Sequence, residues 1–262
     1  MDKASWGGLL IGLSGIVGGL LLEGGNLKQV LQPTAAMIVF GGTAGAVLIQ
    51  FPLPVVVAAL RRLLQVFFEP KLDPQVIIQT LVKFAKQARR DGIVSLDSSL
   101  AGIDDPFLKK ALMLAVDGME PQDLRNLMEL ELDNQSEREE KIPQVFESAG
   151  GFAPTIGIIG AVLGLIQVMQ HLDMIDEVGR GIAVAFVATI YGVGAANMIL
   201  LPCAGKLKIR IREEQTLREI MLEGVASILE GMNPRILENT LAAFLAGKRP
   251  AESAARAAGA AK

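Results

Sequence analysis

Four stretches of this sequence run for 17 to 23 residues without a charged side chain, and this feature constrains the fold most. A helix needs about 20 mostly apolar residues to cross a bilayer, with a lower limit of about 17. Core helices of water-soluble proteins rarely stay uncharged over that length. The sequence therefore predicts an all-α, polytopic membrane protein whose four transmembrane helices cover residues 6–22, 35–51, 153–172 and 182–204.

The segments between and after these spans are charged. Hydrophobic residues make up 51% of the chain and charged residues 20%, with a mean hydropathy of +0.42. This mixture is too apolar for an average soluble protein and too charged for a chain that lies wholly in lipid. We predict a transmembrane hairpin, a helical cytoplasmic domain, a second hairpin and a helical tail at residues 1–51, 52–150, 151–204 and 205–262.

The positive charges predict the orientation. Residues 52–150 hold 12 Lys and Arg residues and residues 205–262 hold 10, which leaves only Lys3, Lys28 and Arg180 elsewhere. Cytoplasmic segments of membrane proteins carry an excess of these residues, most strongly beside the span ends. We therefore expect a multi-pass protein of the bacterial inner (cytoplasmic) membrane with both termini in the cytoplasm. The short loops 23–34 and 173–181 would then be periplasmic.

Three helices are expected in the charged domain. Pro74 opens one over Gln75–Arg90, Pro106–Val116 forms the second, and Pro121 begins the third. The third helix leads into the charged run 137–141, which is typical of a solvated helix face. We expect Pro143 to bend or interrupt the chain before the third span, because an interior proline removes a backbone hydrogen bond.

The tail is expected to continue the fourth span as a helix. This helix should run from Lys206 to about Gly231. The small-residue, low-complexity end over 248–262 is typical of disorder.

Residues that could perform enzyme chemistry are scarce. The single histidine, His171, and the single cysteine, Cys203, cannot build a zinc site or a Cys–His nucleophile pair. The Gly-Lys pair Gly247-Lys248 has Ala242 where a phosphate-binding loop needs glycine. A net charge of −3 gives no basic face for nucleic acid. We therefore expect no enzyme activity, no cofactor, no metal and no nucleic-acid partner.

The spans are rich in small residues placed four apart. This spacing lets helix backbones approach closely in lipid, where no hydrophobic force drives helices together. The pattern predicts dense packing within a bundle or between copies of the chain. The pairs are Gly8 and Gly12, Gly15 and Gly19, Gly41 and Gly45, Gly160 and Gly164, and Ala188 and Gly192.

None of the four spans contains Asp, Glu, Lys or Arg. Ion relays and proton pumps normally need an ionisable group within the membrane to bind and release the ion. These spans offer hydroxyl and amide groups instead, among them Thr155, Thr189, Tyr191 and Asn197. If this chain lines an ion pathway, a partner must bring the carboxylate.

The order of two spans, a charged helical segment, two spans and a basic tail resembles the MotA/PomA stator subunits of bacterial flagellar motors. Two regions carry the resemblance. One is Ala88–Asp97, which resembles the stretch where that family presents charges to the rotor. The other covers Phe152–Leu165 and Ile182–Gly192, followed by Asn197 and Pro202.

This resemblance implies an assembly and a function. The chain would form a homopentamer in the membrane lipid, around two copies of a MotB-like single-span subunit that is anchored to peptidoglycan. Aspartates of that partner would carry the ion, and the ring would exert torque on the rotor protein FliG. The chain would thus be the channel-lining stator subunit that couples proton flow, or else sodium flow, to rotation.

The resemblance also assigns roles to residues. Thr189 would face the partner's aspartate, with Thr155 and Phe186 beside it and Tyr191 on the same pathway. Ala161 stands where sodium-type members have threonine, which favours protons. The family's two coupling prolines would be Pro154 and Pro202, and its rotor-facing charges would be Arg89, Arg90 and Asp97, the last being usually a glutamate.

Plainer interpretations and other functions remain. Pro154 could start a helix, Pro202 could end one, Thr189 could bond its own helix's carbonyls, and the charges could be solvated surface. A TolQ/ExbB-like subunit shares the last two spans but lacks the first hairpin. A gliding-type motor subunit, or a membrane scaffold without ion flux, also fits the sequence.

Overall fold

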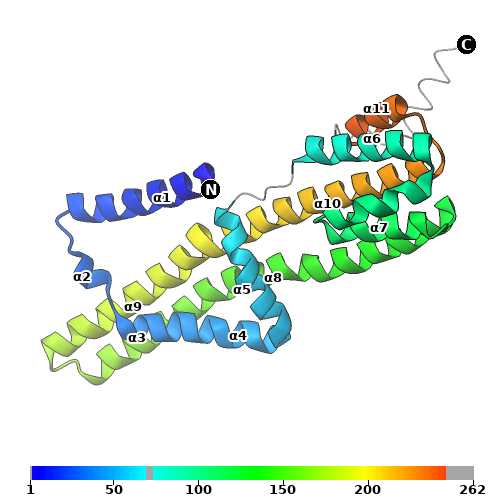
Figure 1. Ribbon diagram of the computed structural model, residues 1–262. Coiled ribbons are helices and arrows are strands. Elements are labelled where there is room, and N and C mark those ends of the chain that lie inside the picture. The colour runs from blue at the N-terminus through cyan, green and yellow to red at the C-terminus, as the bar shows by residue number, and fades with distance from the viewer. Residues whose placement is uncertain (1, 69–72, 246–262) are drawn as a thin grey trace, which may run out of the picture. The chain divides into compact units, whose positions relative to one another are not determined.

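The computed structural model describes residues 2–68 and 73–245, and none of these residues lies in a strand (Figure 1). The predicted fold class is confirmed, because four helices are long and apolar enough to cross a membrane. They are Lys3–Leu22, Pro33–Gln50, Pro121–Gln170 and Ile175–Leu229. The predicted disordered end, 248–262, lies outside the described residues.

The helices divide between two compact units, Met1–Pro70 with Glu139–Arg210 and Lys71–Arg138 with Ile211–Lys262. Helices α8 and α10 each contribute to both units. The α-helices are α1 (Lys3–Leu22), α2 (Leu27–Val30), α3 (Pro33–Ala36), α4 (Gly42–Gln50), α5 (Leu53–Phe67), α6 (Pro74–Asp91), α7 (Pro106–Val116), α8 (Pro121–Gln170), α9 (Ile175–Ala195), α10 (Leu201–Leu229) and α11 (Pro234–Leu245).

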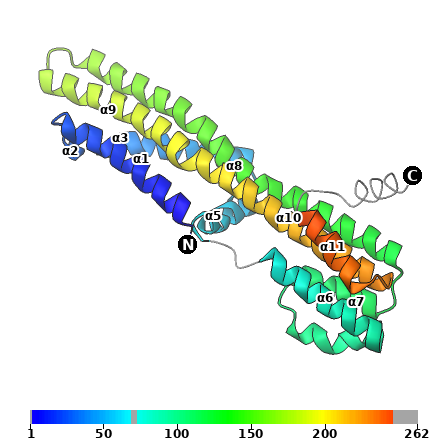
Figure 2. The ribbon, with the colours of Figure 1, turned by 90° about the horizontal axis from the view of Figure 1, so that it is seen from above.

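In the first unit, α8 and α9 form an antiparallel hairpin, seen from two sides in Figures 1 and 2. Small residues face each other along its whole length. A Cβ on Gly157 would lie 2.9 Å from the carbonyl oxygen of Ala188, and one on Gly164 would lie 2.7 Å from that of Gly181. The contact residues repeat at intervals of four, three and four on both helices: Ala153, Gly157, Gly160 and Gly164 against Gly181, Ala185, Ala188 and Gly192.

This repeat shows which of the predicted glycine pairs act inside the chain. Gly160, Gly164, Ala188 and Gly192 do, because their backbones touch the opposite helix. The pairs of α1 and α4 do not, apart from Gly12, which faces the Met198 side chain; an added Cβ on the others would meet nothing within 4 Å.

The expected interruption at Pro143 is wrong. Helix α8 continues for 50 residues with Pro143 and Pro154 inside it. Pro143 is itself buried, and its neighbours Val145 and Phe146 pack into an apolar core with α4, α5 and α10. This packing holds the helical path although the proline cannot donate its backbone hydrogen bond.

Two wider turns interrupt the regular helix in the other spans. The π-helix η1 (Met37–Gly41) joins α3 to α4, and the π-helix η3 (Ala196–Leu200) joins α9 to α10. Pro202 is the second residue of α10, which continues to Leu229, so this proline does not end a helix. A π turn is a wider helical turn that contains one extra residue, and such turns are frequent at functional sites.

The charged run 137–141 is not simply a solvated face. Glu139 is buried and pairs with Arg62 of α5 at 3.1 Å. Sequence spacing could not show this, because Arg62 reaches Glu139 from 77 residues away.

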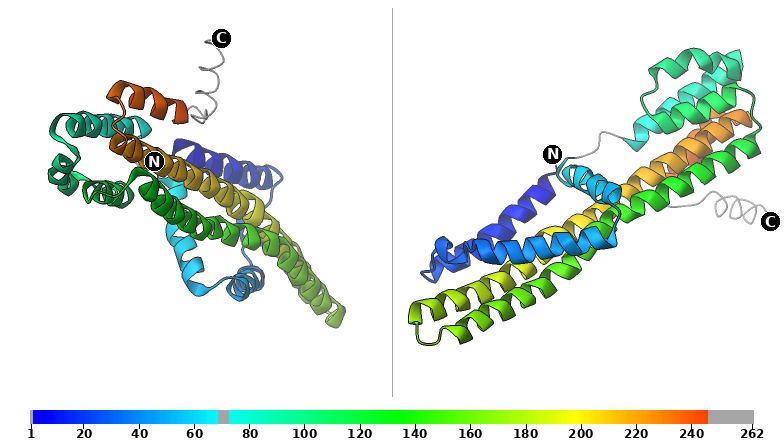
Figure 3. Two further views of the ribbon diagram at one scale, coloured as in Figure 1. Left: turned by 90° about the vertical axis from the view of Figure 1, so that its right-hand side faces the viewer. Right: turned by 90° about the horizontal axis from the view of Figure 1, so that it is seen from below.

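The second unit is a helical cluster of α6, α7, α11 and the 3-10 helix η2 (Ile93–Gly102) with parts of α8 and α10 (Figure 3). The three predicted helices of the charged domain are present, and each starts at its predicted proline. The predicted tail helix is α10, whereas α11 was not predicted. Leu81 is fully buried in this unit's core and lies against Gly224, where a Cβ would clash with it.

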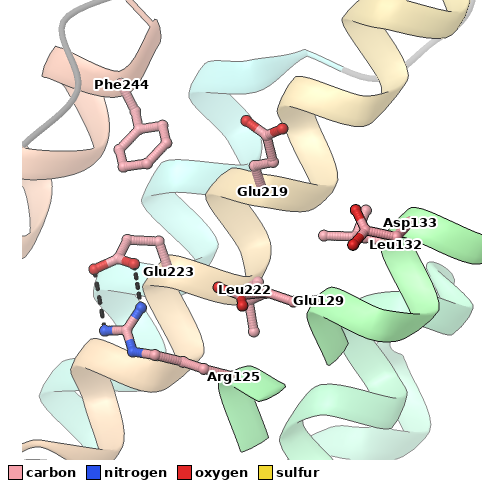
Figure 4. Close-up of a pocket in the computed structure, with 8 residues that line it drawn as sticks. All are labelled: Arg125, Glu129, Leu132, Asp133, Glu219, Leu222, Glu223 and Phe244. Atoms are coloured by element: carbon pink, nitrogen blue, oxygen red, sulfur yellow. Dashed lines mark hydrogen bonds and ion pairs between the residues drawn. The ribbon is translucent and has the colours of Figure 1, made fainter. Parts of the chain in front are cut away.

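Charges join the helices at the edge of this second core. Arg125 of α8 pairs with Glu223 and, at 3.2 Å, with Glu230 of α10. Figure 4 shows Arg125 and Glu223 beside a cavity of about 250 Å³ that Phe244 also lines.

Candidate functional site: an uncovered face of the α8–α9 hairpin

The α8–α9 hairpin carries large apolar side chains that the described parts of the first unit leave uncovered. We call this set the hairpin face. In a membrane, such a surface contacts lipid or another protein chain. Its members are Ile158, Ile159, Val162, Leu163, Leu165, Ile166 and Met169 of α8, and Ile175, Ile182, Phe186, Ile190 and Val193 of α9.

Two predicted site residues lie at one level of this hairpin. Gly157, two residues after Thr155, packs against the backbone of Ala188 and Thr189. The Thr155 hydroxyl donates to the carbonyl of Phe152 at 2.8 Å, and the Thr189 hydroxyl donates to that of Ala185 at 3.2 Å. The plainer interpretation of Thr189 thus holds in this chain by itself. Each hydroxyl oxygen still has lone pairs that can accept a further hydrogen bond.

The remaining predicted pathway residues lie in different environments on the hairpin. Phe186 is 69% exposed on the hairpin face, and Ala161 is half-buried on α8. Tyr191 lies elsewhere on α9: its hydroxyl donates to the carbonyl of Val30 at 2.6 Å and accepts from the N–H of Gln32 at 3.3 Å. Tyr191 therefore fixes the connection between α2 and α3 to α9.

Pro154 and Pro202 each leave a backbone carbonyl without its helical donor. For Pro154 that carbonyl belongs to Gly150, one turn earlier in α8. A Cβ on Gly150 would lie 2.6 Å from the Leu201 side chain, so this point of α8 touches the residue just before Pro202. The two weakened turns thus meet near the π-helix η3, and the interpretation of Pro154 as a helix start is wrong.

The predicted rotor-facing charges lie in the second unit and are all exposed. Arg89 and Arg90 end α6, and Asp97 lies on η2. The Arg90 guanidinium donates to the Asp91 carboxylate at 2.8 and 3.0 Å, and it lowers the pKa of Asp91. Arg89 and Asp97 form no ion pair with the residues that the structure describes.

One site was missed from the sequence. Asp2 is 5% exposed and its carboxylate binds Lys206 at 2.5 Å and Arg210 at 3.2 Å. Its backbone N–H donates to the carbonyl of Phe67 at 3.0 Å. An aspartate just before an apolar run signals a helix cap, which Asp2 provides to Ala4 at 3.1 Å, but its distant partners leave no sequence signal.

No described group of three or more His, Cys, Asp or Glu side chains could hold a metal ion. The hairpin face carries no carboxylate or amine either, over 153–170 of α8 and 181–195 of α9. It can supply apolar contact and hydroxyl oxygens to an ion-carrying group, but it has no such group itself.

Comparison with known proteins gives consistent results over almost the whole chain. The profile of the Motility protein A N-terminal region matches residues 6–92, and that of the MotA/TolQ/ExbB proton channel family matches 99–220. Motility protein A of Bacillus subtilis (strain 168) is 37% identical over 252 residues, which is 95% of this chain and 92% of that protein.

Two solved structures have the same fold. The structure of C. jejuni MotAB has a TM-score of 0.88 at 32% identity, covering 93% of this chain and 96% of that one. The flagellar MotAB stator complex from Bacillus subtilis has a TM-score of 0.84 at 36% identity, covering 92% and 96%. The chain therefore belongs to the MotA/TolQ/ExbB proton channel family, as a MotA-like stator subunit and not an enzyme.

Proposed function

We propose that this chain is the channel-lining subunit of a proton-driven flagellar stator, in which a MotB-like single-span partner supplies the ion-carrying carboxylate. The hairpin face is the observation that carries this proposal. It is apolar, uncovered and free of ionisable groups, yet it has hydroxyl groups at one level. A partner helix with one carboxylate would complete it, and the two solved structures compared above are described as MotAB structures.

The proposed assembly is a homopentamer around two partner helices that are anchored to peptidoglycan, in the inner membrane with both termini in the cytoplasm. The spacing of Lys and Arg residues along the sequence supports this orientation. With the exposed Arg89 and Asp97, the second unit would act on the rotor protein FliG.

Protons are the proposed ion. Sodium has to exchange its water for several oxygen ligands, and Ala161 puts a methyl group where a threonine would add one oxygen. Swimming in sodium-free medium, with the chain and its MotB-like partner in a strain lacking its own stator, tests this point. Rotation that stops when sodium is withdrawn would overturn the proton assignment.

Thr189→Val tests the pathway itself. We expect rotation to fall at least tenfold while Thr189→Ser retains most of it, since only the hydroxyl is needed to meet the partner's carboxylate. Thr216→Val is the matched control, because the Thr216 hydroxyl makes the same own-helix bond, 3.0 Å to the carbonyl of Arg212. Equal rotation of Thr189→Val and the wild type would favour a scaffold without ion flux.

The remaining alternatives concern which kind of ion-driven motor the chain belongs to. A TolQ/ExbB-like role is disfavoured because the first hairpin is present and the Motility protein A N-terminal profile matches it. A gliding-type motor predicts that no flagellar MotB-like partner restores swimming with this chain. Loss of rotation with every such partner would therefore contradict the flagellar assignment.

A further inference from the structure

A second cavity lies in the first unit, where α4 ends and α5 begins. It measures about 500 Å³ and is lined by side chains of η1, α4, α5, α8, α9 and η3. The sharp turn between α4 and α5 that forms one end of it is visible in Figure 1. We propose that this cavity binds an acyl chain of an anionic phospholipid, whose headgroup phosphate is held by Arg61.

The lining excludes a polar ligand. Thr43 is the one polar side chain in it, and the Thr43 hydroxyl already donates to the carbonyl of Val39 at 2.6 Å. The other lining side chains are aliphatic or phenylalanine, as in Val47 and Phe146. Pockets of 300–1,000 Å³ with apolar walls accept hydrocarbon-like ligands of that size. The cavity can therefore hold a hydrocarbon chain, but its lining has no polar partner to offer a charged or hydrogen-bonding ligand.

The place of the cavity identifies the source of that hydrocarbon. Its α4 wall belongs to the candidate membrane span Pro33–Gln50. Leu48 of this wall is 52% exposed and Leu60 of the α5 wall is 58% exposed, so the cavity opens outward. Lipid acyl chains surround a membrane span. If the cavity stayed empty beside them, the side chains that line it would lose van der Waals contacts, so an acyl chain is the ligand at hand.

Arg61 supplies the charge complementarity. Leu53, Val57 and Leu60 form an apolar stripe on α5, and Arg61 lies one helical turn beyond Val57. Arg61 is exposed and forms no ion pair with the described residues, whereas the next residue, Arg62, is bound to Glu139 at 3.1 Å. Basic residues beside such clefts at a membrane surface bind anionic headgroups. An interfacial helix with this pattern places its apolar stripe among acyl chains and its cation at the phosphates.

Photo-crosslinking tests the site in the full chain assembled with its partner in lipid nanodiscs. The probes are phosphatidylglycerol and phosphatidylcholine, each with a diazirine on the acyl chain, and mass spectrometry locates the adducts. We expect phosphatidylglycerol adducts on the lining residues of α4 and α5. Arg61→Gln should lower their yield about fivefold and remove the preference over phosphatidylcholine, since one basic side chain near the surface contributes about that factor.

Ala44→Phe should abolish the adducts, because Ala44 lines the cavity and is exposed, so that a phenyl ring enters it without displacing the core. Ala46→Phe, on the same helix outside the lining, and Lys28→Gln, in α2 and also outside the lining, are the matched controls and should change nothing. Arg61→Gln and Ala44→Phe are measured separately, so a folding defect in one variant leaves the result of the other interpretable.

Two outcomes overturn the proposal. Adducts that survive both Arg61→Gln and Ala44→Phe would show only unspecific boundary lipid. A photoreactive benzoylphenylalanine in place of Leu60 that links two protein chains, with no lipid adduct, would show that a protein fills the cavity. These readouts do not involve rotation, so they stand or fall independently of the proposed motor function.

Discussion

At the scale of single residues, Asp2 joins three helices of the first unit. The Asp2 carboxylate caps α1, binds two cations of α10 and lies beside the end of α5 through its backbone bond to Phe67. The Nε of Arg210 is buried without a hydrogen-bond partner among the described residues. Among the described residues, Asp2 is the acceptor that offsets the burial of Arg210, and its loss would leave a buried charge.

Asp2→Asn should therefore lower the Tm of the purified complex. The measurement is thermal unfolding, and the matched control is Lys208→Gln, which breaks the exposed pair with Glu147 and should cost under about 1 kcal/mol. Equal Tm changes in the two variants would contradict a structural role for Asp2.

The Asp2 contribution should not vary with pH near neutrality. The hydrogen bond from Lys206, which outweighs the opposing effect of burial, holds the pKa of Asp2 well below its ordinary value. A carboxylate with a depressed pKa stabilises the fold fully above its unfolded pKa, and loses that contribution only as the pH falls through the folded value. The Tm difference between Asp2→Asn and wild type should thus be constant from about pH 6 to about pH 8.

Arg89 and Arg90 should differ in their effect on rotation. Arg90 is paired with Asp91, whereas Arg89 forms no ion pair with the described residues, so under the proposed function it would be available to an acidic group on the rotor. We expect Arg89→Glu to reduce swimming speed more than Arg90→Glu does. Asp91→Asn, which releases Arg90, should partly restore swimming in the Arg89→Glu background. Swimming on soft agar and the rotation of tethered cells measure the effect. A larger loss of rotation in Arg90→Glu than in Arg89→Glu would contradict this prediction.

At the scale of elements, the α8–α9 contact explains how two long helices stay together in lipid. Backbone approach replaces the hydrophobic effect there, and only glycine and alanine permit it. The alternation of four and three residues keeps the small residues on one side of each helix over three turns. Spacing alone identified Gly160 and Gly164, but it selected α1 and α4 pairs equally, because the same spacing can serve contacts outside this chain.

Gly164→Leu should disrupt the hairpin, since its side chain would meet the backbone of Gly181 and Ala185. Overpacking of this kind costs about 1–3 kcal/mol or more, and here no flexible side chain can give way. Gly45→Leu is the matched control, as nothing in the chain lies within 4 Å of a Cβ at Gly45. Protease resistance of the membrane-inserted protein measures the difference, and equal resistance of both variants would contradict the packing argument.

At the scale of the whole molecule, the chain has membrane spans but no means of carrying a proton through them. The spans hold no Asp, Glu, Lys or Arg, and several of their hydroxyl groups already bond their own helices, as those of Thr43, Thr155 and Thr189 do. The free-energy cost for a bare proton to cross the bilayer is prohibitive unless an ionisable group binds it on the way.

This chain alone should therefore not conduct. In liposomes with an internal pH dye, we expect proton uptake equal to that of empty liposomes, and a rise only when the MotB-like partner is present. The control is the same complex with the partner's intramembrane aspartate replaced by asparagine. Proton uptake by the chain without its partner would show that an internal route was overlooked.

The features that follow from local composition could be predicted from the sequence: four spans without Asp, Glu, Lys or Arg, and helices beginning at Pro74, Pro106 and Pro121. Chain length, hydropathy and the missing N–H of proline act on neighbouring residues, so they can be read along the chain.

Three features depend on tertiary contacts: α8 passes through Pro143, Glu139 is buried, and Asp2 binds α10. Each of these depends on residues from distant parts of the sequence. Packing around Pro143 overrides its local preference, and the partners Arg62 and Arg210 come close only when the helices assemble. Such contacts have no fixed spacing in the sequence, which is why no pattern in it could predict them.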